Sequence, residues 1–458
     1  MEINGFRGRL ITADHADYDD ARAIWNGAID RHPRLIARCS GTADVAAAVR
    51  FARDHGLEVA VRGGGHNVAG TAVCDDGIVI DLSEMRAVWV DPASRTARVQ
   101  GGALWGDVDH ETQVHGLATT GGIVSHTGVA GLTLGGGIGW LMRKHGLTVD
   151  NLLAAHAVTA EGEMLRVSED EHPDLFWALR GGGGNFGVVT SFDFRLHPVG
   201  PDVLAGPILW DAADTDKVLR FYRDFVHDAP DELGTVVRFG TAPPLPVIPE
   251  DLHWRPVVMV GSCYAGPIDD GVRVLRPLRA FRTPLLDLVG PTPYVGFQSA
   301  LDSTVVHGWN YYWKSTHLPE LRDDLIDVIA EHAFSCSSPR SYVAMFHLKG
   351  AVSRVAEGGT AFGNRQASHA ITLDSVWRTG EDFGDRDIAW TRELFAALGR
   401  FREGVYVNFL GGDEDPDRVR EAYGDSVYDR LVEVKTTYDP DNVFHHNQNI
   451  RPGSRLGL

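Results

Sequence analysis

Glycine clusters constrain the fold of this chain more than any other feature of its sequence. Five of them fall between residues 62 and 187, and they read RGGGH, QGG, TTGG, LGGGIG and RGGGGNFG. Glycine tolerates positive φ and lets backbone N–H groups approach a bulky ligand closely. The N-terminal part of the chain is therefore predicted to be built around a large, phosphorylated ligand.

The length and net charge of the chain limit the expected number of domains and the expected kinds of partner. At 458 residues the chain exceeds the roughly 250 to 300 residues that one hydrophobic core serves, so two or three domains are expected. The chain has 43 Lys and Arg residues against 62 Asp and Glu residues, a net charge of -19. That charge repels phosphate backbones and anionic lipids, so neither nucleic acid nor membrane is an expected partner.

Cysteine spacing and the N-terminal residues bear on the compartment. The four cysteines show no CxxC spacing, as expected of reduced thiols in a cytosolic protein. The start of the sequence lacks a basic segment followed by an apolar one, and no apolar run approaches ~18 residues. The sequence therefore predicts a cytoplasmic protein.

The common nucleotide and metal motifs do not fit. A formal G-x-G-x-x-G at Gly182, Gly184 and Gly187 follows a predicted helix and precedes a predicted strand, the reverse of the dinucleotide fingerprint. No glycine cluster carries the Lys-Ser/Thr of a Walker A loop. His110 and His115 are five residues apart, whereas a zinc-binding pair on one helix face needs i, i+4 spacing, so no metal site is predicted.

The hydrophobic patterns change character at Pro198. Before it, short strand-like and helical segments alternate with the glycine clusters, and after it the clusters disappear. The second part reads as an α+β domain. Its predicted helices cover residues 215–228 and 318–334, its predicted strands cover residues 255–264, 341–350 and 404–412, and a helical tail covers residues 417–450.

Two features are ambiguous when taken alone. The run GWNYYWKSTHL at residues 308–318 contains four aromatic side chains, which serve equally well in core packing and in stacking against a substrate. His66, which ends the first glycine turn, is by itself more typical of a structural histidine held by a backbone hydrogen bond. Neither the run nor the histidine defines a site without its surroundings.

Taken together, the glycine-rich segments 61–88, 116–152 and 174–199 resemble the vanillyl-alcohol oxidase superfamily of flavoproteins, with its PCMH-type FAD-binding domain. The closing YDPDNVFHHNQNI resembles the C-terminal segment of the berberine-bridge-enzyme-like branch. The resemblance implies an α+β protein with a two-subdomain FAD-binding domain at residues 1–200. It further implies a substrate-binding domain with a large antiparallel sheet at 201–416, and a segment at 417–458 that packs back on the FAD domain.

The same resemblance assigns FAD as cofactor and implies which residues hold it. In this family the histidine that ends the first glycine loop forms a covalent bond with the flavin 8α-methyl, and His66 occupies that place. Backbone N–H groups of the loop would surround the pyrophosphate. The residues expected to bind the cofactor are Gly63, Gly64, Gly65, His66, Asn67, Leu82, Gly122, Thr127, Gly128, Gly131, Gly135, Gly139, Val188 and Asn447.

The sequence departs from the family pattern at two positions. Some relatives hold the flavin a second time through a cysteine, but Val124 stands in that place and cannot form a thioether. The resemblance is therefore closest to members with a single histidyl linkage. Other relatives place a tyrosine base in a Tyr-x-Asn-Tyr strand, where this chain has YVNF and Phe409 replaces the second tyrosine.

Strand alternation suggests which side chains replace the missing base. Tyr406 and Asn408 share one face of their predicted strand, and His347 and Lys349 share one face of another. Either pair is expected to line the substrate cavity, with a solvated sheet face as the alternative for His347 and Lys349. These four residues are the expected catalytic set.

The expected activity is that of an FAD-dependent oxidase. A hydride would pass from the C–H of an alcohol, sugar or amine to flavin N5, and dioxygen would reoxidise the flavin with release of hydrogen peroxide. A role in secondary metabolism suits each of these substrates. A flavin-dependent reductase on the same fold and a non-catalytic flavin carrier remain as alternatives. The sequence does not indicate an oligomeric state.

Overall fold

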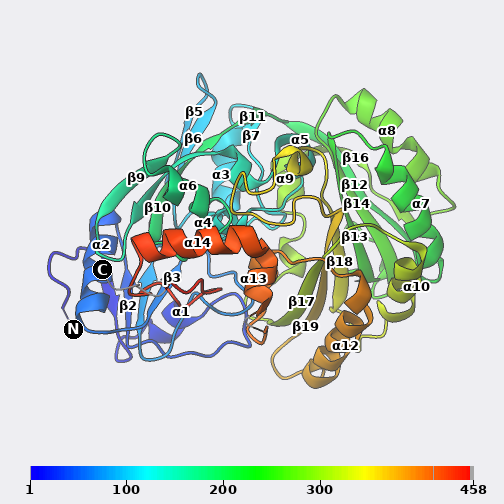
Figure 1. Ribbon diagram of the computed structural model, residues 1–458. Coiled ribbons are helices and arrows are strands. Elements are labelled where there is room, and N and C mark those ends of the chain that lie inside the picture. The colour runs from blue at the N-terminus through cyan, green and yellow to red at the C-terminus, as the bar shows by residue number, and fades with distance from the viewer. Residues whose placement is uncertain (1, 416, 454–458) are drawn as a thin grey trace.

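The computed structural model describes residues 2–415 and 417–453. Figure 1 shows two parts joined near residue 200, with the N-terminal part in blue and cyan and the large sheet in green and yellow. The predicted domain boundaries remain predictions, and residues 1, 416 and 454–458 of those spans lie outside the described residues.

Two small sheets form the N-terminal part, and helix α2 (Thr42–Asp54) contacts strands of both. Strands β2, β4 and β3 pair in parallel, as expected of short strands whose apolar residues are mostly buried. The first sheet has the order β1 (Arg9–Ile11), β2 (Leu35–Arg38), β4 (Ile78–Asp81), β3 (Val59–Arg62). The second has the order β5 (Val88–Asp91), β6 (Thr96–Gln100), β10 (Val188–Arg195), β8 (Leu152–Val158), β9 (Met164–Ser168).

A large antiparallel sheet forms the second part of the chain, as predicted. Its neighbouring strands are β15 (Leu286–Asp287), β12 (Asp202–Asp211), β14 (Pro256–Tyr264), β13 (Leu233–Thr241), β18 (Tyr342–His347), β19 (His369–Trp377) and β17 (Asn310–Leu318), and β16 (Gly290–Pro293) also pairs with β12. A further two-stranded ribbon joins β7 (Leu117–Ala118) to β11 (His197–Pro198).

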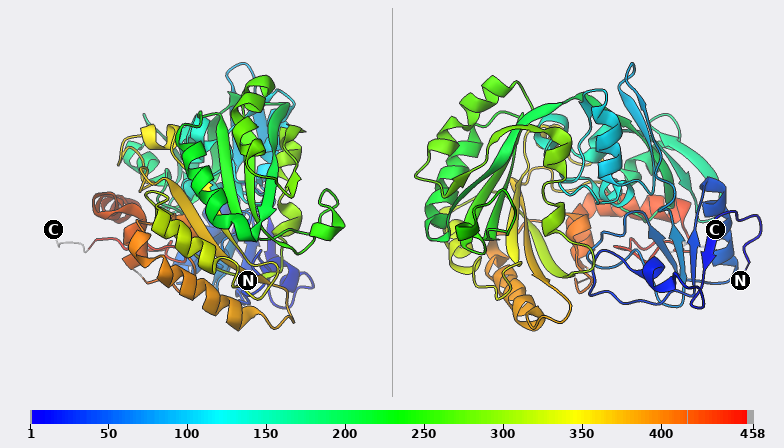
Figure 2. Two further views of the ribbon diagram at one scale, coloured as in Figure 1. Left: turned by 90° about the vertical axis from the view of Figure 1, so that its right-hand side faces the viewer. Right: turned by 180° about the vertical axis from the view of Figure 1, so that it is seen from behind.

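Helices cover one face of the large sheet and leave the other face toward the N-terminal part (Figure 2). The covering helices are α7 (Thr215–His227), α8 (Ile268–Ala280), α10 (Asp323–His332) and α12 (Gly384–Ala397). Strand side chains alternate between the two faces. Val343, Met345, Ile371 and Leu373 therefore pack under the helices, while their neighbours in sequence face the other way.

The remaining helices are short and connect the sheets. They are α1 (Tyr18–Arg22), α3 (Trp105–Gln113), α4 (Val129–Gly135), α5 (Met142–His145), α6 (Pro173–Leu179), α9 (Tyr294–Gln298) and α11 (Ala351–Arg354). Among the described residues no helix combines the length and apolar character needed to cross a bilayer.

The C-terminal segment returns to the N-terminal part (Figure 1, red). The single helical stretch expected there is divided into α13 (Asp417–Tyr423) and α14 (Asp425–Tyr438), because Gly424 has a φ of 75°. Helix α14 contacts α6. The side chain of Asn185 accepts a hydrogen bond from the backbone N–H of Ile450 at 2.9 Å, so the end of the chain is tied to the last glycine cluster.

The prediction of a strand at residues 404–412 is wrong. Val407–Phe409 form a turn of 3-10 helix, in which the Phe409 N–H donates to the Tyr406 carbonyl. The indole N–H of Trp313 on β17 binds the Phe409 carbonyl at 3.0 Å, so a side chain satisfies a group that a neighbouring strand would otherwise bind. The segment is apolar because it is buried on several sides, and its sequence pattern therefore resembles that of a buried strand.

Candidate functional site

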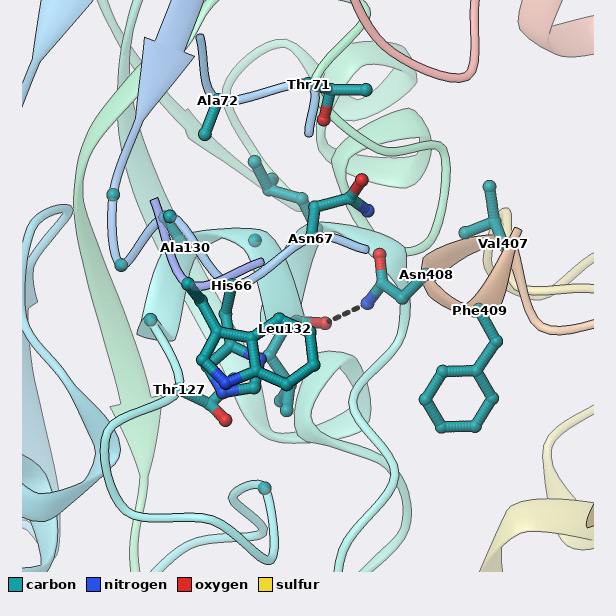
Figure 3. A pocket seen from close by; sticks show the side chains of 18 of the residues that line it. His66, Asn67, Thr71, Ala72, Thr127, Ala130, Leu132, Val407, Asn408 and Phe409 are labelled. Atoms are coloured by element: carbon teal, nitrogen blue, oxygen red, sulfur yellow. Dashed lines mark hydrogen bonds between the residues drawn. The ribbon is translucent and has the colours of Figure 1, made fainter. Parts of the chain in front are cut away.

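A cavity of about 360 Å³ lies between the glycine-rich segments and the uncovered face of the large sheet. Figure 3 shows the part of its wall where His66, Asn67, Thr127 and Leu132 lie near Val407, Asn408 and Phe409. The glycine-rich side of the wall includes residues 63–67, 122–124 and 183–185, the sheet side includes Arg238, Tyr342, Ala344, Phe346, Thr372 and Asp374, and residues 406–409 and 446–448 close the cavity.

The first glycine turn is anchored at the end of β3. The guanidinium of Arg62 pairs with the fully buried carboxylate of Asp81 at 2.7 Å, and Arg38 pairs with the same carboxylate at 2.9 Å. Gly65 then adopts a φ of 64°, a conformation that favours glycine. The anchored strand and this turn together direct His66 into the cavity wall.

His66 is neutral and one of its ring nitrogens has no partner. Trp25 stacks on its ring, with centroids 4.3 Å apart and planes 14° apart. Burial, with a smaller effect of the His126 ring whose centroid is 5.0 Å away, lowers the pKa of His66 to about 3. Nε2 is buried without a hydrogen-bond partner among the described residues. A neutral imidazole with a free nitrogen can act as a nucleophile or accept a hydrogen bond.

Glycine allows two loops to touch at the cavity wall. A Cβ atom on Gly64 would lie 2.4 Å from the backbone nitrogen of Gly128, and a Cβ on Gly128 would lie 2.4 Å from that of Gly64. Gly131 on α4 is exposed toward the cavity, and a Cβ there would meet no atom within 4 Å. The backbone thus leaves open space that a bound group would fill.

Most of the predicted cofactor residues meet at this cavity. Leu82, Gly122, Thr127, Val188 and Asn447 line it together with residues 63–67, Gly128 and Gly131. Asn447 contributes a buried Oδ1 without a partner among the described residues. Gly135 and Gly139 stand behind the wall, where a Cβ would lie 2.1 Å from Asn408 Oδ1 and 1.7 Å from the Gly121 carbonyl oxygen, respectively. The donor groups, open space and unpaired polar atoms fit a bound FAD.

Tyr406 and Asn408 both line the cavity, although the strand expected to align them is absent. The Tyr406 hydroxyl accepts hydrogen bonds from the Gly137 N–H at 2.8 Å and from Asn408 Nδ2 at 2.7 Å. Asn408 Nδ2 also donates to the Leu132 carbonyl at 3.1 Å, the dashed line in Figure 3. Burial raises the pKa of Tyr406 to about 12, so this phenol is neutral. Through its bond to Gly137 the hydroxyl holds the glycine triplet, residues 135–137, in place.

The expectation that His347 and Lys349 line the cavity is wrong. His347 lies on the helix-covered face of β18, 4% exposed, and its ring stacks on His369 with centroids 5.0 Å apart. Burial lowers the pKa of His347 well below the usual value. Lys349 lies beyond the end of β18 and donates from Nζ to the Gln366 carbonyl. The even-numbered residues of β18 face the cavity instead, so the prediction chose the opposite face.

Several residues of the wall were missed by the sequence analysis, namely Trp25, Arg238, Tyr342, Thr372 and Asp374. An aspartate within the apolar strand HAITLDSVW was a visible signal, because a charged residue in a buried strand is unusual. The aromatic run at 308–318 proves mixed. Trp313 lines the cavity, whereas the Tyr312 hydroxyl hydrogen-bonds Asp413 outside it.

The two departures from the family pattern both lie in the wall. Val124 is 9% exposed and faces the cavity from the loop that precedes α4. Phe409 also lines the cavity, next to Asn408 (Figure 3), and its ring packs edge-on against Tyr406 with centroids 4.8 Å apart. Neither side chain can form a thioether or accept a proton.

Comparisons with known proteins agree with this site. A family model described as an FAD binding domain matches residues 33–168, and a model described as berberine and berberine like matches residues 405–451. The (R)-6-hydroxynicotine oxidase of Paenarthrobacter nicotinovorans is 34% identical over 463 residues, which is 97% of each chain. An FAD-linked oxidoreductase of Dictyostelium discoideum is 33% identical over 93% of this chain and 91% of its own.

Solved structures support the same assignment. The crystal structure of 6-hydroxy-D-nicotine oxidase from Arthrobacter nicotinovorans matches with a TM-score of 0.86 at 32% identity, covering 98% of both chains. A chitooligosaccharide oxidase matches with a TM-score of 0.85 at 23% identity over 98% of both chains, which supports the fold alone.

The fold, the cavity and the relatives define an FAD-linked oxidoreductase of the oxidase type. The chain belongs to the berberine-bridge-enzyme-like family of PCMH-type flavoproteins.

Proposed function

We propose that this enzyme carries FAD covalently bound through His66, oxidises a C–H bond of a small molecule, and returns the electrons to dioxygen with release of hydrogen peroxide. The observation that carries the proposal is a neutral His66, with an unpartnered Nε2, in the wall of the cavity that also borders the large sheet. Bound FAD supplies the hydride acceptor. The residues of the chain bind the cofactor, orient the substrate and exclude water.

Each part of the wall has a role in this proposal. Residues 63–67 and Gly128 donate backbone N–H groups toward the cofactor, and Leu82 and Val188 supply apolar contacts. Asn447 Oδ1 and His66 Nε2 are polar atoms that a bound cofactor would satisfy. Tyr406 and Asn408 fix the glycine triplet behind the cofactor. The N-terminal 200 residues and the tail from residue 417 would then form the cofactor domain, and the middle of the chain the substrate domain.

A single covalent bond is part of the proposal. Val124 occupies the place of the second linkage in some relatives, and none of the four cysteines lines the cavity. All four thiols are free, which favours a reducing compartment such as the cytoplasm. Cross-linking through a thiol is therefore excluded from the expected chemistry.

The substrate class is proposed from the relatives. The first relative is named for a hydroxynicotine, which is an amine, and it covers almost the whole chain. A cyclic amine or an alcohol of similar size is therefore the first class to test. A role in secondary metabolism is compatible with either class.

The test uses the purified protein and a panel of alcohols, sugars and cyclic amines. We expect a yellow protein whose colour stays in the pellet after acid precipitation, and peroxide release with at least one class. Flavin found wholly in the supernatant would contradict the covalent bond. Bleaching by NAD(P)H without oxygen, in the absence of any peroxide-forming substrate, would favour a reductase. No turnover with any donor would favour a flavin carrier.

A further inference from the structure

Asp374 is a buried carboxyl in the sheet wall of the cavity, and nothing described so far explains it. It lies on β19 between its cross-strand neighbours Tyr342 on β18 and Trp313 on β17. The residue is 2% exposed and lines the cavity. Its Oδ2 has no hydrogen-bond partner among the described residues. An unsatisfied buried carboxylate oxygen costs stability, so its presence in a cavity wall points to use by a ligand.

The groups around Asp374 leave its protonated and ionised forms nearly equal in free energy near neutral pH. Burial raises the pKa of Asp374 more than Thr372, Arg238 and Tyr342 lower it, so the net pKa is about 7. Arg238 acts on Asp374 through its charge, without a hydrogen bond between the two side chains among the described residues. Its guanidinium lies over the Tyr342 ring, 4.5 Å from the centroid, and donates to the Thr241 carbonyl. A carboxyl in this state can gain or lose a proton near neutral pH.

The other titratable groups around the cavity are less suited to accept a proton. His66 belongs to the cofactor side, and Tyr406 is a neutral phenol whose oxygen already accepts two hydrogen bonds. Burial raises the pKa of Tyr342 well above its usual value, and burial likewise raises that of Tyr311, the remaining phenol next to Asp374. His446 is held by Glu58 at 2.7 Å. Phe409 stands in the position of the family's tyrosine base and cannot accept a proton.

We propose that Oδ2 of Asp374 is the proton acceptor of the reaction. It takes the proton of the O–H or N–H group that is bonded to the substrate carbon being oxidised. The substrate O–H or N–H bond breaks, an Oδ2–H bond forms, and the electron pair stays on the substrate heteroatom, where it forms the new double bond to carbon. The C–H hydrogen leaves with its electron pair to the cofactor, as in the proposed function. The inference rests on that function, and it limits the substrate class to molecules with such a donor on the reacting carbon.

Asp374→Asn is the direct test, because the amide has the same shape and cannot accept the proton. With a hydroxyl-bearing substrate, flavin reduction measured without oxygen is expected to slow by ~10²–10⁴-fold. In the wild type the reduction rate is expected to rise with pH through about 7, and this rise is expected to be absent in the variant. Flavin content and covalent attachment should match the wild type, since the cofactor contacts lie on the other wall.

Asp109→Asn is the matched control. Asp109 is also 2% exposed and burial also raises its pKa to about 7, but it lies on α3 against Gln298 of α9, outside the cavity. This variant should keep the wild-type reduction rate and its pH dependence. A rise through pH 7 that disappears in Asp109→Asn and persists in Asp374→Asn would overturn the proposal.

A measurement without turnover keeps the test independent of activity. An ionised Asp374 is unfavourable in the folded state, so the melting temperature of the Asp374→Asn holoenzyme relative to wild type should increase as pH rises from about 5 to about 8. A constant difference would mean that Asp374 is already ionised in the folded protein across this range, as in the unfolded chain, and would contradict the proposal. Wild-type protein without flavin or peroxide would refute the proposed function, whereas fully flavinylated Asp374→Asn that reduces at the wild-type rate would refute only the role of Asp374.

Discussion

The indole of Trp25 stacks on the imidazole of His66, and it also stacks on Tyr311 of the large sheet, with centroids 3.7 Å apart and planes 21° apart. The backbone N–H of Trp25 donates to the Gly65 carbonyl at 3.1 Å. The next residue, Asn26, donates from its side chain to the carbonyls of Val68 and Tyr311 at 2.8 and 2.9 Å. A short N-terminal segment thus fixes the histidine turn against a strand that lies almost 300 residues later in the sequence.

Replacing Trp25 should slow covalent attachment more than it weakens FAD binding. Without the indole the imidazole of His66 can rotate, and a misplaced nucleophile loses up to about 10²-fold in rate. Trp25→Phe keeps a stacking face and should restore most of the attachment, whereas Trp25→Ala should not. The measurement is the fraction of bound flavin that stays with the protein after acid precipitation, followed over time with FAD added to apoprotein.

Stability must be measured in the same variants, because truncating a buried tryptophan costs ~3–5 kcal/mol. Melting temperatures of both proteins with and without FAD supply that control. If Trp25→Ala remains folded, binds FAD and attaches it at the wild-type rate, the stacking has no role in orienting His66.

His66→Ala should bind FAD without attaching it. Residues 63–67 are expected to contact the cofactor mainly through backbone N–H groups, which the substitution leaves in place. Because Nε2 has no partner among the described residues, the folded protein should lose little stability. Proteolysis and mass spectrometry of the wild type should find one flavinylated peptide, which contains His66. A second flavinylated peptide, especially one with a cysteine, would show that Val124 does not occupy the second linkage position.

The glycine clusters allowed much of the fold and most of the glycine-rich wall of the cavity to be predicted. Their residue types are imposed by backbone geometry, as at Gly64 and Gly128, so a family pattern of glycines carries directly into three dimensions. The large antiparallel sheet was predicted as well. The break at Gly424 and the 3-10 turn at Val407–Phe409 were not, because each depends on tertiary contacts that a local hydrophobic pattern does not contain.

The substrate side of the site was predicted poorly, for a physical reason. In a strand buried on both faces, alternation separates the residues into two sets without saying which set meets the cavity. The prediction chose His347 and Lys349, and the structure places Tyr342, Ala344 and Phe346 there. Arg238 and Asp374 lie on β13 and β19, the two strands that flank β18, and a single sequence does not specify this strand order.

Two glycine substitutions distinguish a glycine that leaves room for the cofactor from a glycine that the packing of the fold requires. Gly131→Ala adds a methyl group where no atom lies within 4 Å, inside helix α4, so the apoprotein should gain ~0.5–1 kcal/mol. The same methyl group projects into the cavity and should reduce flavin content. Gly139→Ala would place a Cβ 1.7 Å from the Gly121 carbonyl oxygen and should destabilise the fold by ~1–3 kcal/mol or more. Melting temperature and flavin absorbance of both variants check this, and equal flavin content in Gly131→Ala and wild type would show that the cofactor does not lie against α4.

A buried histidine outside the cavity is expected to make the protein sensitive to acid. His317 on β17 is fully buried, and neither ring nitrogen has a hydrogen-bond partner among the described residues. Burial, with a smaller effect of Arg418, lowers the pKa of His317 to about 4. In the unfolded chain the histidine takes up a proton below about pH 6.5, while in the folded protein it stays neutral until about pH 4. Its contribution to stability is therefore fully present above about pH 6.5 and is lost as the pH falls.

His317→Leu should remove this contribution without disturbing the strand. The backbone N–H of His317 donates to Gly404 and its carbonyl accepts from Glu403, both at 3.0 Å, and these bonds do not involve the side chain. The free energy of unfolding of the variant minus that of the wild type should be about 2 kcal/mol larger at about pH 5 than at pH 8. Melting temperatures of the two holoproteins across this range provide the measurement. Other buried histidines titrate equally in both proteins and cancel in the comparison, so a difference that stays constant with pH would mean that the pKa of His317 is the same in the folded and unfolded states.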